Sequence, residues 1–151
     1  LLLEGHEIVC LDNFCNSSPK AIDRIIKICD TEGLSDQSIT VIEGDICYEE
    51  TIKNIFKSHS IESVIHFAGL KAIGESVEKP LKYYNNNVGG TLNLLQAMQN
   101  AEVYQIVFSS SATVYGEPDP LPLSEESPTK KPTNPYSQSK LVIENILKDL
   151  S

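Results

Sequence analysis

The chain has 151 residues, of which 40% are hydrophobic and 22% charged, and its formal net charge is −9. This length suffices for one domain with a hydrophobic core, and the composition is that of a globular protein. The acidic excess argues against a nucleic-acid partner, which needs clustered lysine and arginine. No apolar run approaches the roughly 18 residues of a membrane span. The sequence therefore predicts neither a nucleic-acid-binding protein nor a membrane protein.

The cysteines and the two ends of the chain indicate a fragment of a cytoplasmic protein. No C-x-x-C pair is present and no histidine stands at metal-ligand spacing, so we expect no metal site and no disulfide but buried or half-buried thiols at Cys10, Cys15, Cys29 and Cys47. No signal peptide is evident. Residues 1–5 resemble the last turn of a helix that ends at Gly5, and the final residues also follow a helical pattern. We therefore expect that both ends are cut from a longer chain.

Predicted strands and helices alternate along the chain. Apolar or β-branched runs predict strands at residues 7–12, 39–43, 63–68 and 104–109. Helical spacing of apolar residues predicts helices that begin near Pro19, after a Ser17 or Ser18 cap, and that span 49–58, 80–100 and 136–150. The proline-rich residues 116–135 predict a surface loop. This alternation predicts an α/β fold with a mostly parallel sheet and helices on both of its faces.

Apolar residues recur at helical spacing in two of the predicted helices. In the helix 80–100, apolar residues recur at Leu81, Tyr84, Val88, Leu92 and Leu95. In the helix 136–150, the expected buried set is Val142, Ile143, Ile146, Leu147 and Leu150. Gly89 and Gly90 each cost about 1 kcal/mol relative to alanine inside a helix. We therefore expect a strand to pack closely against the helix at these two residues.

The residues after each strand are candidates for a ligand site, because parallel sheets bind ligands beyond the carboxyl ends of their strands. Asp12 ends the first strand, where dinucleotide-binding folds use an acidic residue to accept ribose hydroxyls, and a carboxylate there favours NAD over NADP. Asp45 follows the second strand and could contact adenine. After the third strand, Ala68 and Gly69 would admit a ligand to the backbone, and Lys71 could meet a phosphate. Each of these is also an ordinary strand-end or turn residue.

A Tyr–Lys pair follows the fourth strand and the loop. Tyr136 and Lys140 share one face of a helix. An ammonium about 4 Å from a phenol could favour the phenolate by ~4 kcal/mol, which would make tyrosine a usable base near neutral pH. Three serines, 109–111, end the fourth strand, and one could hydrogen-bond a reacting hydroxyl. This position favours a catalytic pair that removes a hydroxyl proton while hydride leaves the same carbon, although the spacing also arises by chance in many helices.

Four stretches resemble one known family. LDNFCNSS (11–18), HFAGLKAIGES (66–76), FSSSATVYG (108–116) and NPYSQSK (134–140) are similar to the extended short-chain dehydrogenase/reductase superfamily and, within it, to the UDP-glucose 4-epimerase family. The resemblance covers essentially the whole chain. It implies a Rossmann-like doubly wound parallel sheet that binds NAD. It also implies that residues 1–151 form a partial NAD-binding domain, without its first strand and glycine-rich loop and without the C-terminal substrate domain.

The resemblance further implies roles for individual residues. Tyr136 would be the catalytic base, Lys140 would hold the nicotinamide ribose and lower the pKa of Tyr136, and Ser111 would contact the substrate near the sugar O4. The implied reaction interconverts UDP-galactose and UDP-glucose through a 4-keto intermediate, with NAD⁺ taking and returning the hydride. The implied cofactor-binding residues, besides Ser111, Tyr136 and Lys140, are Asp12, Asn13, Phe14, Cys15, Asn16, Ser17, Asp45, Ile46, Phe67, Ala68, Gly69, Leu70, Lys71 and Asn86.

Three alternatives remain open. A sugar-nucleotide dehydratase would carry Asp-Glu after the strand-end serine, where this chain has Ala112 and Thr113. An epimerase acting on UDP-glucuronate or UDP-pentoses fits FAGLKAIGES less well. A non-catalytic NAD-binding protein would not need Tyr136, Lys140 and Ser111 together. The family resemblance also implies a homodimer for the full-length protein, and we expect the isolated 151-residue chain to be inactive.

Overall fold

The N-terminal part of the chain forms a parallel strand pair and one helix. The computed structural model describes residues 1–33, 39–117 and 121–151. Strands β1 (Ile8–Asp12) and β2 (Ile39–Glu43) pair in parallel, with Ile8 opposite Ile39 and Asp12 opposite Glu43. This places the carboxyl ends of both strands at the same edge of the sheet, as the sequence predicts.

The ends of the first helical elements follow their local sequence signals. The short 3₁₀ turn η1 (Leu2–Glu4) ends at Gly5, whose φ of 85° is a conformation that glycine adopts without strain. Helix α1 (Pro19–Thr31) is capped by Ser18, whose side chain accepts a hydrogen bond from the backbone N–H of Lys20.

The chain divides into two compact units, residues 1–45 and residues 46–151.

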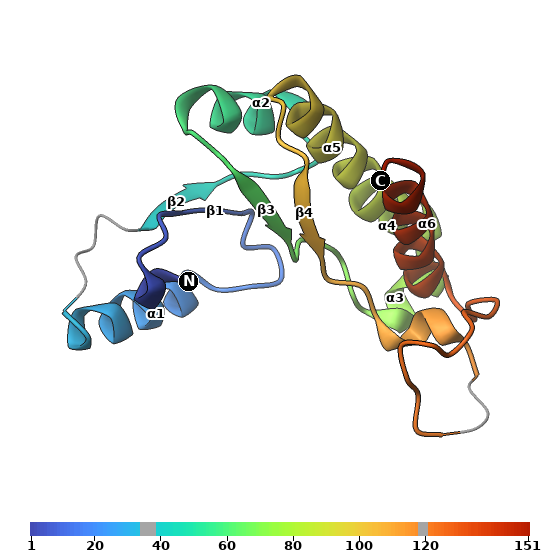
Figure 1. The fold of residues 1–151 in the computed structure, drawn as a ribbon. Helices are drawn as coiled ribbons and strands as arrows, with labels where there is room; N and C mark the ends of the chain where they lie inside the picture. Colours follow the sequence, from blue (N-terminus) through green and yellow to red (C-terminus); the bar gives the residue numbers. More distant parts are fainter. Residues whose placement is uncertain (34–38, 118–120) are drawn as a thin grey trace. The chain divides into compact units, whose positions relative to one another are not determined.

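The second unit contains a parallel strand pair and most of the helices (Figure 1). Strands β3 (Ser63–His66) and β4 (Gln105–Phe108) pair in register, with His66 opposite Phe108. Its other elements are α2 (Glu49–Ser58), α3 (Ile73–Glu78), α4 (Pro80–Tyr83), a π-helical segment η3 (Tyr84–Gly89), α5 (Gly90–Asn100), a 3₁₀ turn η4 (Ala112–Tyr115) and α6 (Pro135–Asp149). The α/β class with parallel strands is confirmed. Helix α3 and the turn η4 were not predicted, because helical segments of six residues or fewer show too little periodicity.

The apolar residues that recur along the helix 80–100 do not all face the interior. Leu81 and Leu92 are 75% and 48% exposed. The residues that face the interior are instead Tyr83, Asn87, Thr91, Leu94 and Met98. The helix contains the π-helical segment η3 between α4 and α5. Asn87 and Thr91 of this face are polar, so the pattern of apolar residues does not reveal it.

Close packing at Gly90 agrees with its expected role. An added Cβ at Gly90 would lie 2.6 Å from the Cδ1 and Cγ1 atoms of Ile46. Real Cβ atoms do not approach other carbons so closely, so only glycine fits without a rearrangement. The neighbour is the segment after β2, however, and not a strand. At Gly89 an added Cβ would meet only the Tyr84 carbonyl oxygen, at 3.9 Å.

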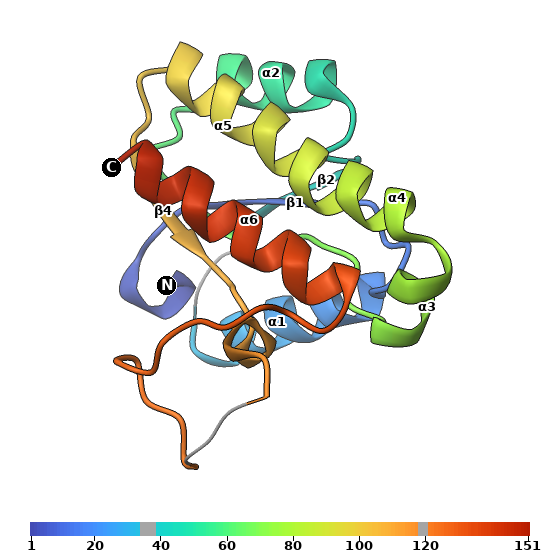
Figure 2. The ribbon, with the colours of Figure 1, turned by 90° about the vertical axis from the view of Figure 1, so that its right-hand side faces the viewer.

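Helix α6 is held in the second unit by α3, α4 and η3 (Figure 2). Ile143 of α6 is fully buried, as predicted, whereas Leu150 is 66% exposed. Leu150 is the residue that caps the helix at its C-terminus, beyond the neighbours that cover the earlier turns. The prediction for Leu150 is therefore wrong.

The cysteines differ in exposure more than the sequence predicts. Cys29 is buried and Cys10 is half-buried, but Cys15 and Cys47 are exposed. Both exposed thiols lie in the turns that follow strands, where side chains leave the sheet.

The loop prediction for 116–135 is confirmed for its described part, and residues 118–120 lie outside the described residues. None of the helices within the described ranges is both long enough and apolar enough to cross a membrane.

Candidate active site

The turn after β1 is built around the Asp12 carboxylate. Its Oδ1 accepts hydrogen bonds from the backbone N–H of Phe14 and from the hydroxyl of Ser17, both at 2.8 Å. Phe14 has a φ of 51°, which is uncommon for a bulky residue and needs such support. The predicted adenosine-side residues 12–17 therefore form one turn in which the Asp12 carboxylate holds two other residues in place.

Asn13 links the carboxyl end of β1 to that of β2. Its Nδ2 donates to Oδ2 of Asp45 at 2.7 Å, and its Oδ1 accepts from the backbone N–H of Cys15 at 3.1 Å. The backbone N–H of Gly44 donates to the Asp12 carbonyl at 3.0 Å. Asp45 and the turn 12–17 thus lie together, as expected from parallel strands. Whether they contact NAD stays a prediction.

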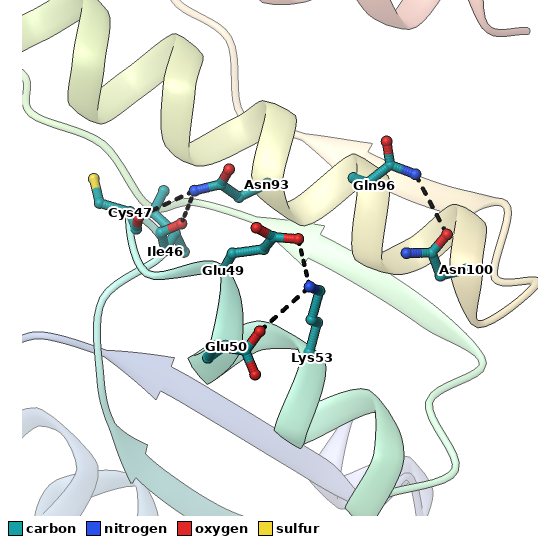
Figure 3. A network of polar contacts seen from close by, with 8 residues as sticks. All are labelled: Ile46, Cys47, Glu49, Glu50, Lys53, Asn93, Gln96 and Asn100. Carbon is teal, nitrogen blue, oxygen red and sulfur yellow. Dashed lines mark hydrogen bonds and ion pairs between the residues drawn. The ribbon is translucent and has the colours of Figure 1, made fainter.

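In the second unit, Asn93 of α5 holds the segment that begins with Ile46. Its Nδ2 donates to the carbonyl oxygens of Ile46 and Cys47, both at 3.1 Å (Figure 3). The thiol of Cys47 lies 3.8 Å from Oδ1 of Asn86. Two predicted cofactor residues, Ile46 and Asn86, are therefore fixed near one another. The ion pairs of Lys53 with Glu49 and Glu50, also in Figure 3, are largely exposed and contribute little to stability.

Asn87 organises the loop after β3, and the sequence analysis missed it. Its Oδ1 accepts from the backbone N–H of Leu70 at 2.8 Å, and its Nδ2 donates to the Leu70 carbonyl at 2.9 Å and to the Ser139 hydroxyl at 3.0 Å. One amide thereby ties the loop 67–72 to α6. Three consecutive asparagines, 85–87, precede Val88. The sequence alone does not distinguish the buried Asn87 from Asn85 and Asn86, because the three are adjacent and chemically identical.

The loop 67–72 contains the predicted cofactor residues Phe67 to Lys71. Phe67, Ala68 and Lys71 are exposed. At Gly69, an added Cβ would lie 3.4 Å from Oδ1 of Asn87 and 3.7 Å from Nζ of Lys140. These are ordinary contact distances, so the loop backbone lies beside the lysine without requiring glycine at this position.

Lys140 is a buried cation. It is 5% exposed, its Nζ donates to the carbonyl oxygen of Ser109 at 2.7 Å, and it lies 4.6 Å from the centre of the Phe108 ring. Cation–π attraction and a carbonyl acceptor favour the ammonium form. Burial opposes it and lowers the pKa of Lys140 below its usual value. Lys140 thus places its amine at the carboxyl end of β4, where a positive charge is poorly solvated.

His66 supports the same cluster as a neutral residue. It is 3% exposed, and its ring centre lies 5.6 Å from that of Phe108. The Thr91 hydroxyl donates to the Asn87 carbonyl at 2.6 Å, so at 2.8 Å it accepts the proton of His66 Nε2. Burial, together with the nearby charge of Lys140, lowers the pKa of His66 to about 4. At neutral pH the imidazole is therefore uncharged.

The strand-end serines and Tyr136 lie on elements that pack together. Ser111 caps η4, and its Oγ accepts from the backbone N–H of Thr113 at 3.3 Å and lies 2.9 Å from Oγ1 of Thr113. Tyr136 is half-buried in the first turn of α6, and its carbonyl accepts from the Ser139 hydroxyl at 2.6 Å. Helix α6 contacts η4. The fold thus brings the serine turn to the helix that carries Tyr136 and Lys140.

These features define a class of protein: a Rossmann-type α/β protein with polar turns at the carboxyl ends of parallel strands and a Tyr–Lys pair beside strand-end serines. The family model that matches residues 1–151 is described as GDP-mannose 4,6 dehydratase. The chain belongs to this family of extended short-chain dehydrogenase/reductases.

Three proteins similar to this chain are UDP-glucose 4-epimerases. The UDP-glucose 4-epimerase of Yersinia enterocolitica is 50% identical over 151 residues, which are 100% of this chain and 43% of that protein. A crystal structure of the Bifidobacterium longum UDP-glucose 4-epimerase with NAD⁺ and UDP matches with a TM-score of 0.91 and 47% identity, over 99% of this chain and 43% of that chain. The Stenotrophomonas maltophila enzyme with NAD and formylated UDP-arabinopyranose matches with a TM-score of 0.88 and 40% identity, over 99% of this chain and 43% of that chain. This chain spans less than half the length of these relatives.

Proposed function

We propose that this chain is part of the NAD-binding domain of a UDP-glucose 4-epimerase, which interconverts UDP-galactose and UDP-glucose through a 4-keto intermediate. The observation that carries the proposal is the buried ammonium of Lys140, one helical turn from Tyr136 and held on the carbonyl of Ser109 at 2.7 Å. A buried cation is costly. The position of this buried lysine at a strand end, beside an exposed loop, supports a catalytic role. The relatives named above are epimerases.

The chain's residues fit NAD at two places. In the first unit, the turn 12–17 and Asp45 present a carboxylate and polar groups suited to the adenosine ribose. In the second unit, the backbone of Gly69 lies beside Lys140, where an added Cβ would be 3.7 Å from Nζ. Ile46, Asn86 and the loop 67–71 would hold the middle of the cofactor, and Lys140 would hold the nicotinamide ribose. When bound, NAD supplies the hydride acceptor and donor.

The residues of α6 and the serine turn would remove and return the proton of the sugar 4-hydroxyl. Tyr136 would take the proton of the sugar 4-hydroxyl and return it after the keto sugar has turned over. Ser111 would hydrogen-bond the same sugar oxygen. General acid–base catalysis of this type contributes about 10²–10⁴-fold to a rate.

A dehydratase is the second candidate, because the matching family model carries that description. Elimination of water needs a further acid and base near the substrate. The residues after Ser111 are Ala112 and Thr113, and Thr113 Oγ1 is already 2.9 Å from the Ser111 hydroxyl. The missing acidic pair favours epimerisation.

The test is an assay of the complete gene product with UDP-galactose and NAD. We expect UDP-glucose to form until the two sugars reach equilibrium, with no net change in NADH. A 4-keto-6-deoxy sugar would show a dehydratase instead. Retention of NAD without any turnover would show a non-catalytic NAD-binding protein.

The proposal extends to domains and assembly. The epimerase would supply a strand with a glycine-rich turn and a substrate domain in addition to this chain, and it would act as a cytoplasmic homodimer. We therefore expect no turnover by the isolated 151-residue chain, and sedimentation of the complete gene product as a dimer. Epimerisation by the isolated chain would contradict this division of roles.

A further inference from the structure

A second side chain of α6 holds the serine turn, in addition to Lys140. Glu144 lies one helical turn after Lys140 on the same face. Its Oε1 accepts a hydrogen bond from the hydroxyl of Ser110, and this contact is partly buried. None of the roles assigned above to Tyr136, Lys140 and Ser111 uses Glu144.

The two contacts act on consecutive residues of one short segment. Lys140 holds the Ser109 carbonyl at 2.7 Å, and Glu144 holds the Ser110 side chain. The next residue is Ser111, which turns into η4 and bonds only locally to Thr113 in the contacts described above. The position of Ser111 relative to α6 therefore depends on the two residues before it.

The same helix carries Tyr136, two turns before Glu144. We propose that Glu144 and Ser110 are positioning residues that hold the Ser111 hydroxyl where it and Tyr136 reach the same substrate oxygen. The proposal rests on the proposed function. A hydrogen bond to a carboxylate is roughly twice as strong as one between neutral groups. That strength suits a contact that must keep a turn from shifting by a fraction of an ångström, since small misplacements of reacting groups lower rates strongly.

A purely structural contact would have different consequences. Loss of such a contact would lower stability and activity whatever residue stands at position 111. Loss of a positioning contact lowers the rate only through the Ser111 hydroxyl, so the loss has no effect once that hydroxyl is removed. The two roles are separated by a double-mutant cycle.

The experiment measures kcat, KM and bound NAD for variants of the complete gene product. Glu144→Ala and Ser110→Ala should each lower kcat about tenfold, the loss expected for one hydrogen bond to a charged group, with KM and bound NAD unchanged. The double variant should be no slower than either single variant. In a Ser111→Ala background, Glu144→Ala should have no further effect. Glu144→Gln, which keeps an acceptor oxygen, should recover part of the rate.

Asp149→Ala provides the matched control, because it removes an exposed carboxylate from the same helix. It should leave kcat unchanged. An equal loss from Glu144→Ala with and without Ser111 would overturn the proposal, as would no loss in either background. If Glu144→Ala fails to fold, Glu144→Gln and Ser110→Ala carry the same cycle. An inactive parent protein would instead overturn the proposed function itself.

Discussion

The turn after β1 and the cluster around Lys140 are held together by contacts of different range. The partners of Asp12 are two and five residues away in the sequence. Asn87 bonds residues 17 and 52 positions away, and Lys140 bonds a residue 31 positions away. Asn13 of the first region also reaches Asp45, 32 residues away, but the turn itself is shaped mostly by contacts within its own sequence, whereas the second region is shaped by the fold. Substitutions in the first should change ligand binding alone, whereas several in the second should also change stability.

The largest expected effect is on catalysis in the second region. Tyr136→Phe removes the proton acceptor and keeps the ring, so kcat of the complete gene product should fall about 10³-fold. Bound NAD and the melting temperature should stay the same. Tyr104→Phe is the control, since Tyr104 is exposed and lies before β4. A Tyr136→Phe enzyme with more than a tenth of the normal kcat would refute the assigned role.

Asn87→Ala should destabilise the protein strongly. It leaves the backbone N–H and carbonyl of Leu70 and the Ser139 hydroxyl without this partner, and each such loss costs about 1–3 kcal/mol. We expect the free energy of unfolding to fall by about 3–4 kcal/mol, measured by urea titration. Asn85→Ala, at an exposed position of the same segment η3, should change it by less than about 0.5 kcal/mol. Equal effects would contradict the assignment of Asn87.

His66 should make the second region sensitive to acid. Its pKa is about 4 in the folded protein, against 6.5 for an unperturbed histidine. Between these values the unfolded chain binds more protons, so stability falls as the pH falls from about 6.5 to about 4. The loss should reach about 3 kcal/mol, from 1.36 kcal/mol per pKa unit. His66→Gln should remove most of this pH dependence, and His6→Gln, at an exposed position, should leave it intact.

The smallest expected effect lies in the first region. Asp12→Asn keeps an acceptor for Phe14 and Ser17 but removes the charge, so NAD affinity should fall about tenfold. Discrimination against NADP should weaken, because the repulsion of a 2′-phosphate is lost. Stability and kcat at saturating NAD should not change. Asp23→Asn, on the exposed side of α1, is the control. A large loss of stability in Asp12→Asn would show that this turn also depends on the fold.

The same difference in range decides what could be predicted from the sequence. The bounds of β2 and α2 agree with the prediction, because alternation and helical spacing are local signals. The Ser18 cap and the Gly5 stop are also local. The inward face of the helix 80–100 could not be predicted, because it includes the polar residues Asn87 and Thr91. Asn87 was missed for that reason, and because its partners come from the loop after β3 and from α6.

For the site, the serine turn, Lys140 and the loop 67–71 were predicted to lie together, and the structure places them in one cluster. The contact of Glu144 with Ser110 was not predicted. Its signal, a glutamate four residues after Lys140, is the same as that of any solvated helix face. Only the packing of α6 beside the end of β4 distinguishes it.

The most direct test of the central claim is a chimera in which residues 1–151 replace the matching 43% of the Yersinia enterocolitica epimerase. Its rate of conversion of UDP-galactose to UDP-glucose is the single quantity to measure. If Tyr136, Lys140 and Ser111 of this chain form an epimerase centre, the chimera should turn over and retain NAD. A folded chimera that retains NAD and shows no conversion would contradict the claim.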